Sequence, residues 1–175
     1  MGMKHCGKSS FGKLLAASLN YPFVDLDDLI LAKARSRGFF SVRELYRTVG
    51  LKIFQEYETE ALNIIHNARE SRPSVLSLGG GYADNNTAMQ TAADIGHRIY
   101  LRVPEQTLYR RIIRGGLPPF LEGEASPEEL FHQLYLRRDG LYASYAALIV
   151  ALPDQDLEQN FNLLYSEVKE YINVR

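Results

Sequence analysis

The sequence has 175 residues, 46% of them hydrophobic, which suits one ordinary domain with a sizeable core. The formal net charge is −1 and the charges are mixed along the chain, so we expect neither a nucleic acid nor a membrane surface as a partner, because both favour a basic patch. The single cysteine, Cys6, cannot form an internal disulfide, and no run resembles a signal peptide or a membrane span. We therefore expect one cytoplasmic, monomeric domain over residues 1–175.

Hydrophobic spacing, capping residues and Gly or Pro breaks predict alternating helices and strands. In chain order these are a helix over 8–19, a strand at 23–24 feeding a helix, helices beginning at 41–44 and spanning 51–69, a strand over 74–78, a helix over 84–93, a strand over 98–103, a helix over 105–114, a mobile loop over 115–124, a helix over 126–142, a strand over 147–152 and a last amphipathic helix over 157–171. This alternation predicts an α/β fold whose parallel sheet is covered by helices on both faces, a three-layer sandwich.

The first motif is a phosphate-binding loop. Residues 2–9, GMKHCGKS, fit the pattern G-x-x-x-x-G-K-[ST], and a helix follows at once. In this pattern backbone N–H groups surround phosphates, the lysine (Lys8) reaches the terminal phosphates and the serine (Ser9) binds Mg²⁺. We therefore predict ATP binding by this loop, through Gly2, Lys4, His5, Cys6, Gly7, Lys8, Ser9 and Ser10. Such a loop usually follows a buried strand, and here only Met1 precedes it, so the strand lies upstream or is missing from the domain.

Two aspartates end the first predicted strand. Asp25 and Asp27 alternate there, so one carboxylate can face a metal while the other faces a substrate hydroxyl, as phosphoryl transfer requires. An acidic helix cap at Asp27 or Asp28 is the alternative. Beside a phosphate loop we favour the catalytic interpretation.

Three consecutive glycines, Gly79, Gly80 and Gly81, follow the next strand. Glycine allows a ligand to approach the backbone closely, and parallel sheets bind ligands at the carboxyl ends of their strands. The pairs Arg110–Arg111 and Arg137–Arg138 lie on predicted helices, where a solvated helix face is the simplest interpretation of each pair.

Together these segments resemble shikimate kinase over nearly the whole chain. The resemblance is carried by residues 2–10, FVDLD at 23–27, VLSLGGG at 75–81 and RRDGLY at 137–142. It implies a P-loop fold like that of nucleoside-monophosphate kinases, with a five-stranded parallel sheet, a substrate-binding helical region over about 28–70 and a lid over about 114–125. The implied activity is transfer of a phosphoryl group from ATP to the 3-hydroxyl of shikimate.

The resemblance also implies roles for particular residues. Asp25 would hold Mg²⁺ through water together with Ser9, and Asp27 would bind the accepting hydroxyl and help to remove its proton. Gly79–Gly81 would line the acid site, Arg138 would pair with the substrate carboxylate, and Arg111 would pack on adenine.

Three departures from the family pattern stand out. Gln55 follows Phe54 where the family has a carboxylate-binding arginine, and Pro118 stands where the family lid carries an arginine. Lys52, one turn before Gln55, is a candidate to restore the first charge, and Arg114 is a candidate to reach the γ-phosphate. The family strand before the phosphate loop is central in the sheet, so we expect an apolar run upstream of Gly2.

These departures leave two other functions open. One is a kinase for another small hydroxy acid or polyol, because the phosphate-binding parts are intact while the acid-binding parts are altered. The other is a non-catalytic ATP-binding domain of the same fold.

Overall fold

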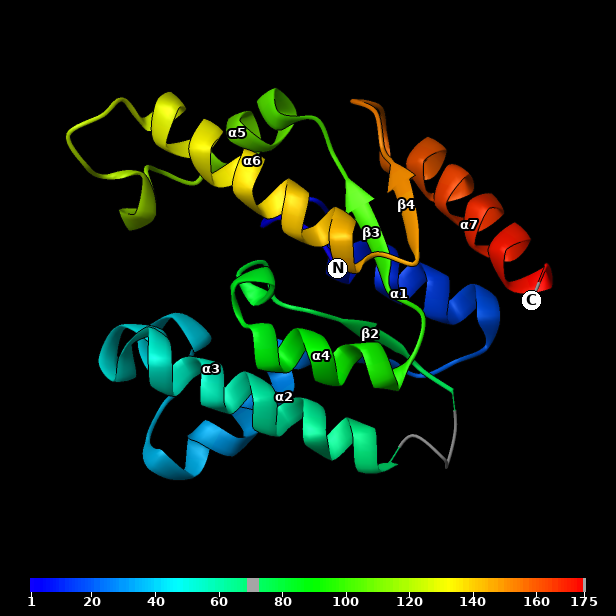
Figure 1. Ribbon diagram of the computed structural model, residues 1–175, viewed down its shortest axis with the longest axis horizontal. Coiled ribbons are helices and arrows are strands. Elements are labelled where there is room, and N and C mark those ends of the chain that lie inside the picture. The colour runs from blue at the N-terminus through cyan, green and yellow to red at the C-terminus, as the bar shows by residue number, and fades with distance from the viewer. Residues whose placement is uncertain (69–72, 175) are drawn as a thin grey trace. The chain divides into compact units, whose positions relative to one another are not determined.

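The computed structural model describes residues 1–68 and 73–174 (Figure 1). The chain forms two compact units, one made of Met1–Phe11 with His97–Arg175 and the other of Gly12–Gly96. Helix α1 (Lys8–Leu19) begins in the first unit and continues into the second, as the sequence predicts for residues 8–19. Each unit is described by itself.

The first unit is built on two parallel strands, β3 (Ile99–Arg102) and β4 (Leu148–Ala151). Their register places Leu101 opposite Val150, and both side chains are buried. Met1 pairs with the other edge of β3, where its amino group donates to the Ile99 carbonyl at 2.7 Å and its carbonyl accepts from the Leu101 N–H at 3.0 Å. Strand β3 is therefore hydrogen-bonded along both of its edges.

The helices of this unit are α5 (Glu105–Ile113), the short 3-10 helix η3 (Pro119–Leu121), α6 (Pro127–Tyr145) and α7 (Leu157–Asn173). The predicted cap of α6 is confirmed, since the Ser126 hydroxyl accepts from the Glu129 N–H at 3.2 Å. Helix α7 runs beside β4, and α6 lies against β3 (Figure 1), while α5 and η3 contact α6. The ring of Tyr142 on α6 stacks on that of Tyr100 on β3.

The second unit contains the other parallel pair, β1 (Phe23–Asp25) and β2 (Val75–Ser77). Its helices are α2 (Leu26–Ala34), α3 (Val42–Ala68), α4 (Asn86–Ile95) and two 3-10 helices, η1 (Arg35–Arg37) and η2 (Tyr82–Asp84). Helices α3 and α4 lie side by side (Figure 1). The core of this unit includes the buried side chains of Leu45, Leu62 and Met89.

The helices predicted from 41–44 and over 51–69 are confirmed as two helical segments of α3, because the backbone of Gly50 between them is not helical (φ 75°, ψ 175°); position 69 lies outside the described residues. Two expectations differ from the structure. The helix predicted from Asp84 begins at Asn86, because Asn85 caps it. The described residues form two two-stranded ladders, one in each unit, where the resemblance implied five strands.

Candidate active site

The phosphate loop, residues 2–10, turns sharply before α1. Gly7 has φ 95°, and a Cβ added there would lie 2.7 Å from the Phe11 ring, so a larger residue would disturb both the backbone and the packing. His5 also has a positive φ of 65°. The loop thus leads directly to the N-terminus of α1, where backbone N–H groups favour anions.

Lys8 is held against this loop. Its ammonium donates to the Met3 carbonyl at 2.9 Å and lies 3.9 Å from the Cys6 sulfur. Cys6 is fully buried, which supports its interpretation as a structural filler of the loop. Ser9 and Ser10, in the first turn of α1, are exposed. The lysine ammonium therefore lies within the loop, and the hydroxyl-bearing residues of α1 are open to solvent.

Further positive charge surrounds the loop. Arg111 of α5 donates to the His5 carbonyl at 3.4 Å. Burial lowers the pKa of His5, and the charges of Lys4, Lys8 and Arg111 lower it further. Asp154 balances part of this charge, because its carboxylate lies 2.5 Å from Arg110 and 3.9 Å from Arg111. The resulting environment suits a polyphosphate.

The predicted lid follows α5. Arg114 caps α5 through its backbone N–H and is exposed, and Pro118 accepts from the Leu121 N–H at 2.9 Å. Leu121 is 1% exposed, whereas Leu117 and Phe120 are about half exposed. Leu121 thus anchors this segment in the core, while the side chains of Leu117 and Phe120 are open to solvent.

Asp25 and Asp27 lie where β1 meets α2. The helix begins two residues earlier than an Asp27 cap would require, and Asp25 is the cap: its carboxylate accepts from the Asp27 N–H at 3.1 Å. Both aspartates are half-buried. Capping therefore belongs to Asp25, while the Asp27 side chain extends from the first turn of α2.

Asp27 approaches the glycine run. A Cβ added to Gly79 would lie 3.1 Å from Asp27 Oδ1 and 3.8 Å from Glu58 Oε1, so two carboxylates border this glycine. Gly79 also accepts from the Tyr82 N–H at 3.3 Å as the chain turns into η2. The structure thus brings together two residues that the sequence nominated separately, Asp27 and Gly79.

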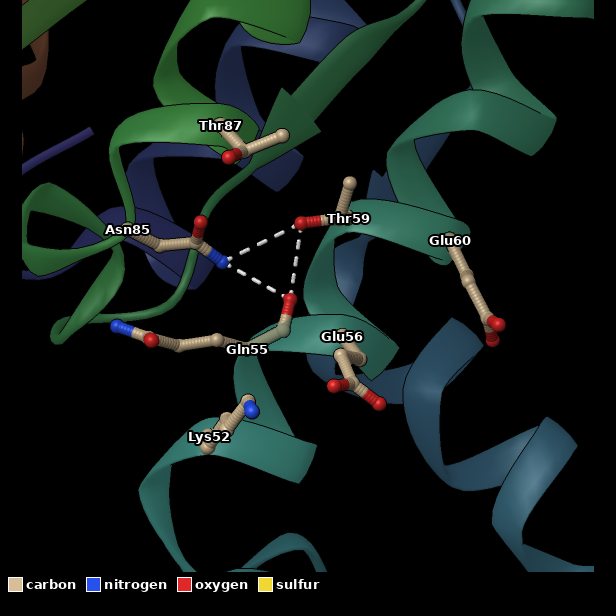
Figure 2. A pocket seen from close by; sticks show the side chains of 7 residues that line it. All are labelled: Lys52, Gln55, Glu56, Thr59, Glu60, Asn85 and Thr87. Carbon is tan, nitrogen blue, oxygen red and sulfur yellow. Dashed lines mark hydrogen bonds between the residues drawn. The ribbon is translucent and has the colours of Figure 1, made fainter.

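Gln55 lies on α3 beside the start of α4. Its side-chain amide donates to the Asp84 carbonyl at 3.0 Å. A hollow of about 460 Å³ is lined here by Lys52, Gln55, Glu56, Thr59, Glu60, Asn85 and Thr87 (Figure 2). Lys52 therefore lines the same hollow as Gln55, as its position one turn earlier predicts.

Two residues of this region were missed by the sequence reasoning. Glu58 and Asn85 are 4% and 5% exposed, and the Asn85 amide donates to Glu58 Oε2 at 3.0 Å. The spacing of Glu58 from Gln55 on one helix, and the capping preference of asparagine before a helix, were the available signals.

Arg138, the predicted carboxylate-binding residue, lies half-buried on α6. The next residue, Asp139, forms a bidentate ion pair with Arg102 of β3 (2.7 and 2.8 Å) and accepts from the Tyr100 hydroxyl at 2.7 Å. Burial and this hydrogen bond raise the pKa of Tyr100. The network fixes α6 to β3 at the turn that carries Arg138.

The sequence predicts two magnesium ligands, Ser9 and Asp25. Among the described residues, no group of three or more His, Cys, Asp or Glu side chains is arranged for a metal ion. Magnesium in phosphoryl-transfer sites is usually held by one or two protein oxygens together with phosphates and waters. Ser9 offers an exposed hydroxyl and Asp25 a half-buried carboxylate, and both are oxygen donors of the kind that Mg²⁺ prefers.

Within residues 1–68 and 73–174, no helix combines the length and apolarity that crossing a membrane requires.

Comparisons with known proteins identify the family. The shikimate kinase family model matches residues 4–169. The shikimate kinase of Chlamydia pneumoniae is 36% identical over 141 residues, which cover 79% of this chain and 76% of that protein.

Solved structures agree with this match. Shikimate kinase from Acinetobacter baumannii in complex with shikimate aligns over 99% of this chain and 90% of its own, with a TM-score of 0.77 and 25% identity. Shikimate kinase from Bacteroides thetaiotaomicron aligns over 99% and 96%, with a TM-score of 0.77 and 26% identity. The fold is therefore the α/β P-loop kinase fold with parallel strands, and the chain belongs to the shikimate kinase family.

Proposed function

We propose that this chain transfers the γ-phosphoryl group of ATP to the 3-hydroxyl of shikimate. The observation that carries the proposal is the close approach of Asp27 to Gly79 in a chain that also has a complete phosphate loop and belongs to the shikimate kinase family. An acidic side chain beside an open backbone is suited to bind a hydroxyl and accept its proton.

The phosphate loop supplies the donor side. Lys8 releases the Met3 carbonyl and pairs with the transferring phosphoryl group, where charge develops in the transition state. Backbone N–H groups at the start of α1 hold the other phosphates, and Arg111 packs on adenine. Ser9 and Asp25 are the residues that would hold Mg²⁺, which would neutralise phosphate charge.

In the second unit, α2, α3 and the glycine run supply the acceptor side. Asp27 orients the accepting hydroxyl and takes its proton, and Gly79–Gly81 let the substrate approach the backbone. Arg138 pairs with the carboxylate. We assign the substrate-binding region to residues 28–70 and the lid to residues 114–125 of one P-loop kinase domain.

One observation favours a second acceptor class. Gln55 offers an amide where the family pattern has an arginine, and this amide already donates to the Asp84 carbonyl. A neutral polyol needs no cation at this position, because it carries no carboxylate. An acceptor screen of shikimate, related hydroxy acids and polyols with ATP separates the two classes, and ATP binding without transfer to any acceptor would identify a non-catalytic domain.

The phosphate loop itself is tested by Lys8→Ala. We expect phosphotransfer to fall by about 10³-fold or more, with the fold intact, because the charge on the transition state is no longer compensated. Lys169→Ala, which removes a lysine from α7, is the matched control and should retain full turnover. Near-normal turnover of Lys8→Ala would contradict the assignment as a kinase.

A further inference from the structure

Asn85 joins the start of α4 to one turn of α3. Its Oδ1 caps α4 by accepting from the Ala88 N–H at 3.1 Å. Its Nδ2 lies 2.9 Å from the Gln55 carbonyl, 3.0 Å from Glu58 Oε2 and 3.5 Å from Thr59 Oγ1. Figure 2 shows this nitrogen directed at the Gln55 carbonyl and the Thr59 hydroxyl, which are themselves hydrogen-bonded at 2.9 Å.

The residue that Asn85 holds is buried next to the glycine run. Glu58 is 4% exposed, and while its Oε2 accepts from Asn85, its Oε1 points toward Gly79. Asp27 Oδ1 lies on the same glycine, 3.1 Å from the point that a Cβ would occupy. A buried carboxylate needs hydrogen-bond donors, and the bond from Asn85 also orients the carboxylate so that its second oxygen faces the glycine.

A second contact ties the same segments together. The Gln55 side chain donates to the Asp84 carbonyl, so the turn 55–59 of α3 is bonded to residues 84 and 85 in both directions. Only a side chain that both accepts and donates can cap α4 and hold Glu58 at once, and asparagine has both groups. Aspartate would cap equally well but would have no N–H to donate.

We propose that Asn85 is a positioning residue for the acceptor side of the active site, where it sets the placement of Glu58 and the turn 55–59 beside Gly79 and Asp27. This inference rests on the proposed function, because it assigns Asn85 to the binding of shikimate and not of ATP. Asn85 acts through Glu58 and α3 and has no chemical step of its own.

The decisive variant is Asn85→Asp. It keeps the capping oxygen of α4, removes both N–H donors and places a carboxylate opposite Glu58. The matched control is Asp156→Asn, the reverse exchange at the N-cap of α7, where the cap oxygen accepts from the Gln159 N–H at 2.8 Å. Both exchanges preserve side-chain size and the cap.

The contact itself is tested by thermal unfolding of Asn85→Asp, Glu58→Gln and the double variant. We expect Asn85→Asp to lower the unfolding midpoint. The double variant should regain much of the loss, because the amide at position 58 can donate to the carboxylate at position 85. Strictly additive effects of the two changes would overturn the proposal.

The positioning role is tested by steady-state kinetics. We expect Asn85→Asp to raise the KM for shikimate about tenfold or more at saturating ATP, with the KM for ATP unchanged, while Asp156→Asn changes neither. A residue that only capped α4 would leave both KM values alone, so unchanged values overturn the proposal. If the wild-type protein does not phosphorylate shikimate, the proposed function fails. The unfolding midpoints of the single and double variants then test whether Asn85 holds Glu58 in place.

Discussion

Asp27 lies at the start of α2, close to the glycine run. Its own N–H donates to the capping carboxylate of Asp25 at 3.1 Å, and its Oδ1 lies 3.1 Å from the point that a Cβ on Gly79 would occupy. For the base that we propose, a place in the first turn of a helix limits the entropy lost on meeting a hydroxyl. Asp25 caps α2 in the structure, and its role as a metal ligand is part of the proposal.

Asp27→Asn should therefore reduce turnover far more than ATP binding. The change keeps the shape and removes the base, so we expect kcat to fall by about 10²- to 10⁴-fold with a nearly unchanged Kd for ATP. Asp28→Asn, at the exposed neighbour on α2, is the control and should behave as wild type. A loss of ATP affinity with turnover preserved would show that the base had been assigned to the wrong aspartate.

Gln55→Arg tests the altered acid site. A guanidinium can form a bidentate pair with a carboxylate, which an amide cannot, so the KM for shikimate should fall by about 10- to 100-fold at saturating ATP. Gln55→Lys is the matched comparison and should give a smaller gain, because an ammonium lacks the planar fork. An unchanged KM in the arginine variant would favour a different acceptor.

At the scale of the element, α6 contains a replaceable glycine. Gly140 lies inside the helix, and a Cβ added there would meet no atom within 4 Å. Gly140→Ala should increase the free energy of unfolding by about 0.5–1 kcal/mol, because alanine loses less backbone entropy in a helix. Chemical denaturation measures this change, and a decrease in stability would show that the surroundings of the glycine had been misjudged.

Helix ends were predicted best where the cap is local. Ser126 caps α6 as expected, and Ser41 caps α3 by accepting from the Glu44 N–H at 3.1 Å. The start of α4 was placed too early, because an aspartate and an asparagine stand next to each other and either can cap. Asn85 is the cap because its side chain also hydrogen-bonds to Gln55 and Glu58 of α3, about 30 positions earlier in the chain. Local sequence patterns do not reveal such distant contacts.

At the scale of the whole molecule, the charge around the phosphate loop predicts a pH dependence. The pKa of His5 in the folded protein lies below its ordinary value because of burial and three nearby cations. As the pH falls from neutral toward that lowered pKa, the unfolded chain binds a proton that the folded protein does not, so stability decreases.

His5→Asn removes this titration and keeps a residue type that tolerates the positive φ at position 5. Thermal unfolding between about pH 7.5 and 5.5 should show a smaller loss of stability in the variant than in the wild type. Equal losses in the two proteins would mean that His5 does not contribute to acid sensitivity.

The sequence predicted the order of elements over the whole chain more securely than their pairing. In the described part of the chain, the four strands lie where apolar runs end at Asp, Gly or Pro, but the separation into two parallel ladders depends on contacts between distant segments. The placement of Glu58 was beyond prediction for the same reason, since Asn85 and Gly79 approach it only in the folded unit. Phosphate-loop residues were predictable because the motif is continuous in the sequence.

The central claim is tested most directly by the product of the reaction with ATP and shikimate. Wild-type protein should convert the two into ADP and a phosphorylated shikimate, and NMR of the purified product should show the phosphate on the 3-hydroxyl. Lys8→Ala should form no such product under the same conditions. A folded wild-type protein that binds ATP and leaves shikimate unmodified, or that phosphorylates a different acceptor far faster, would contradict the account.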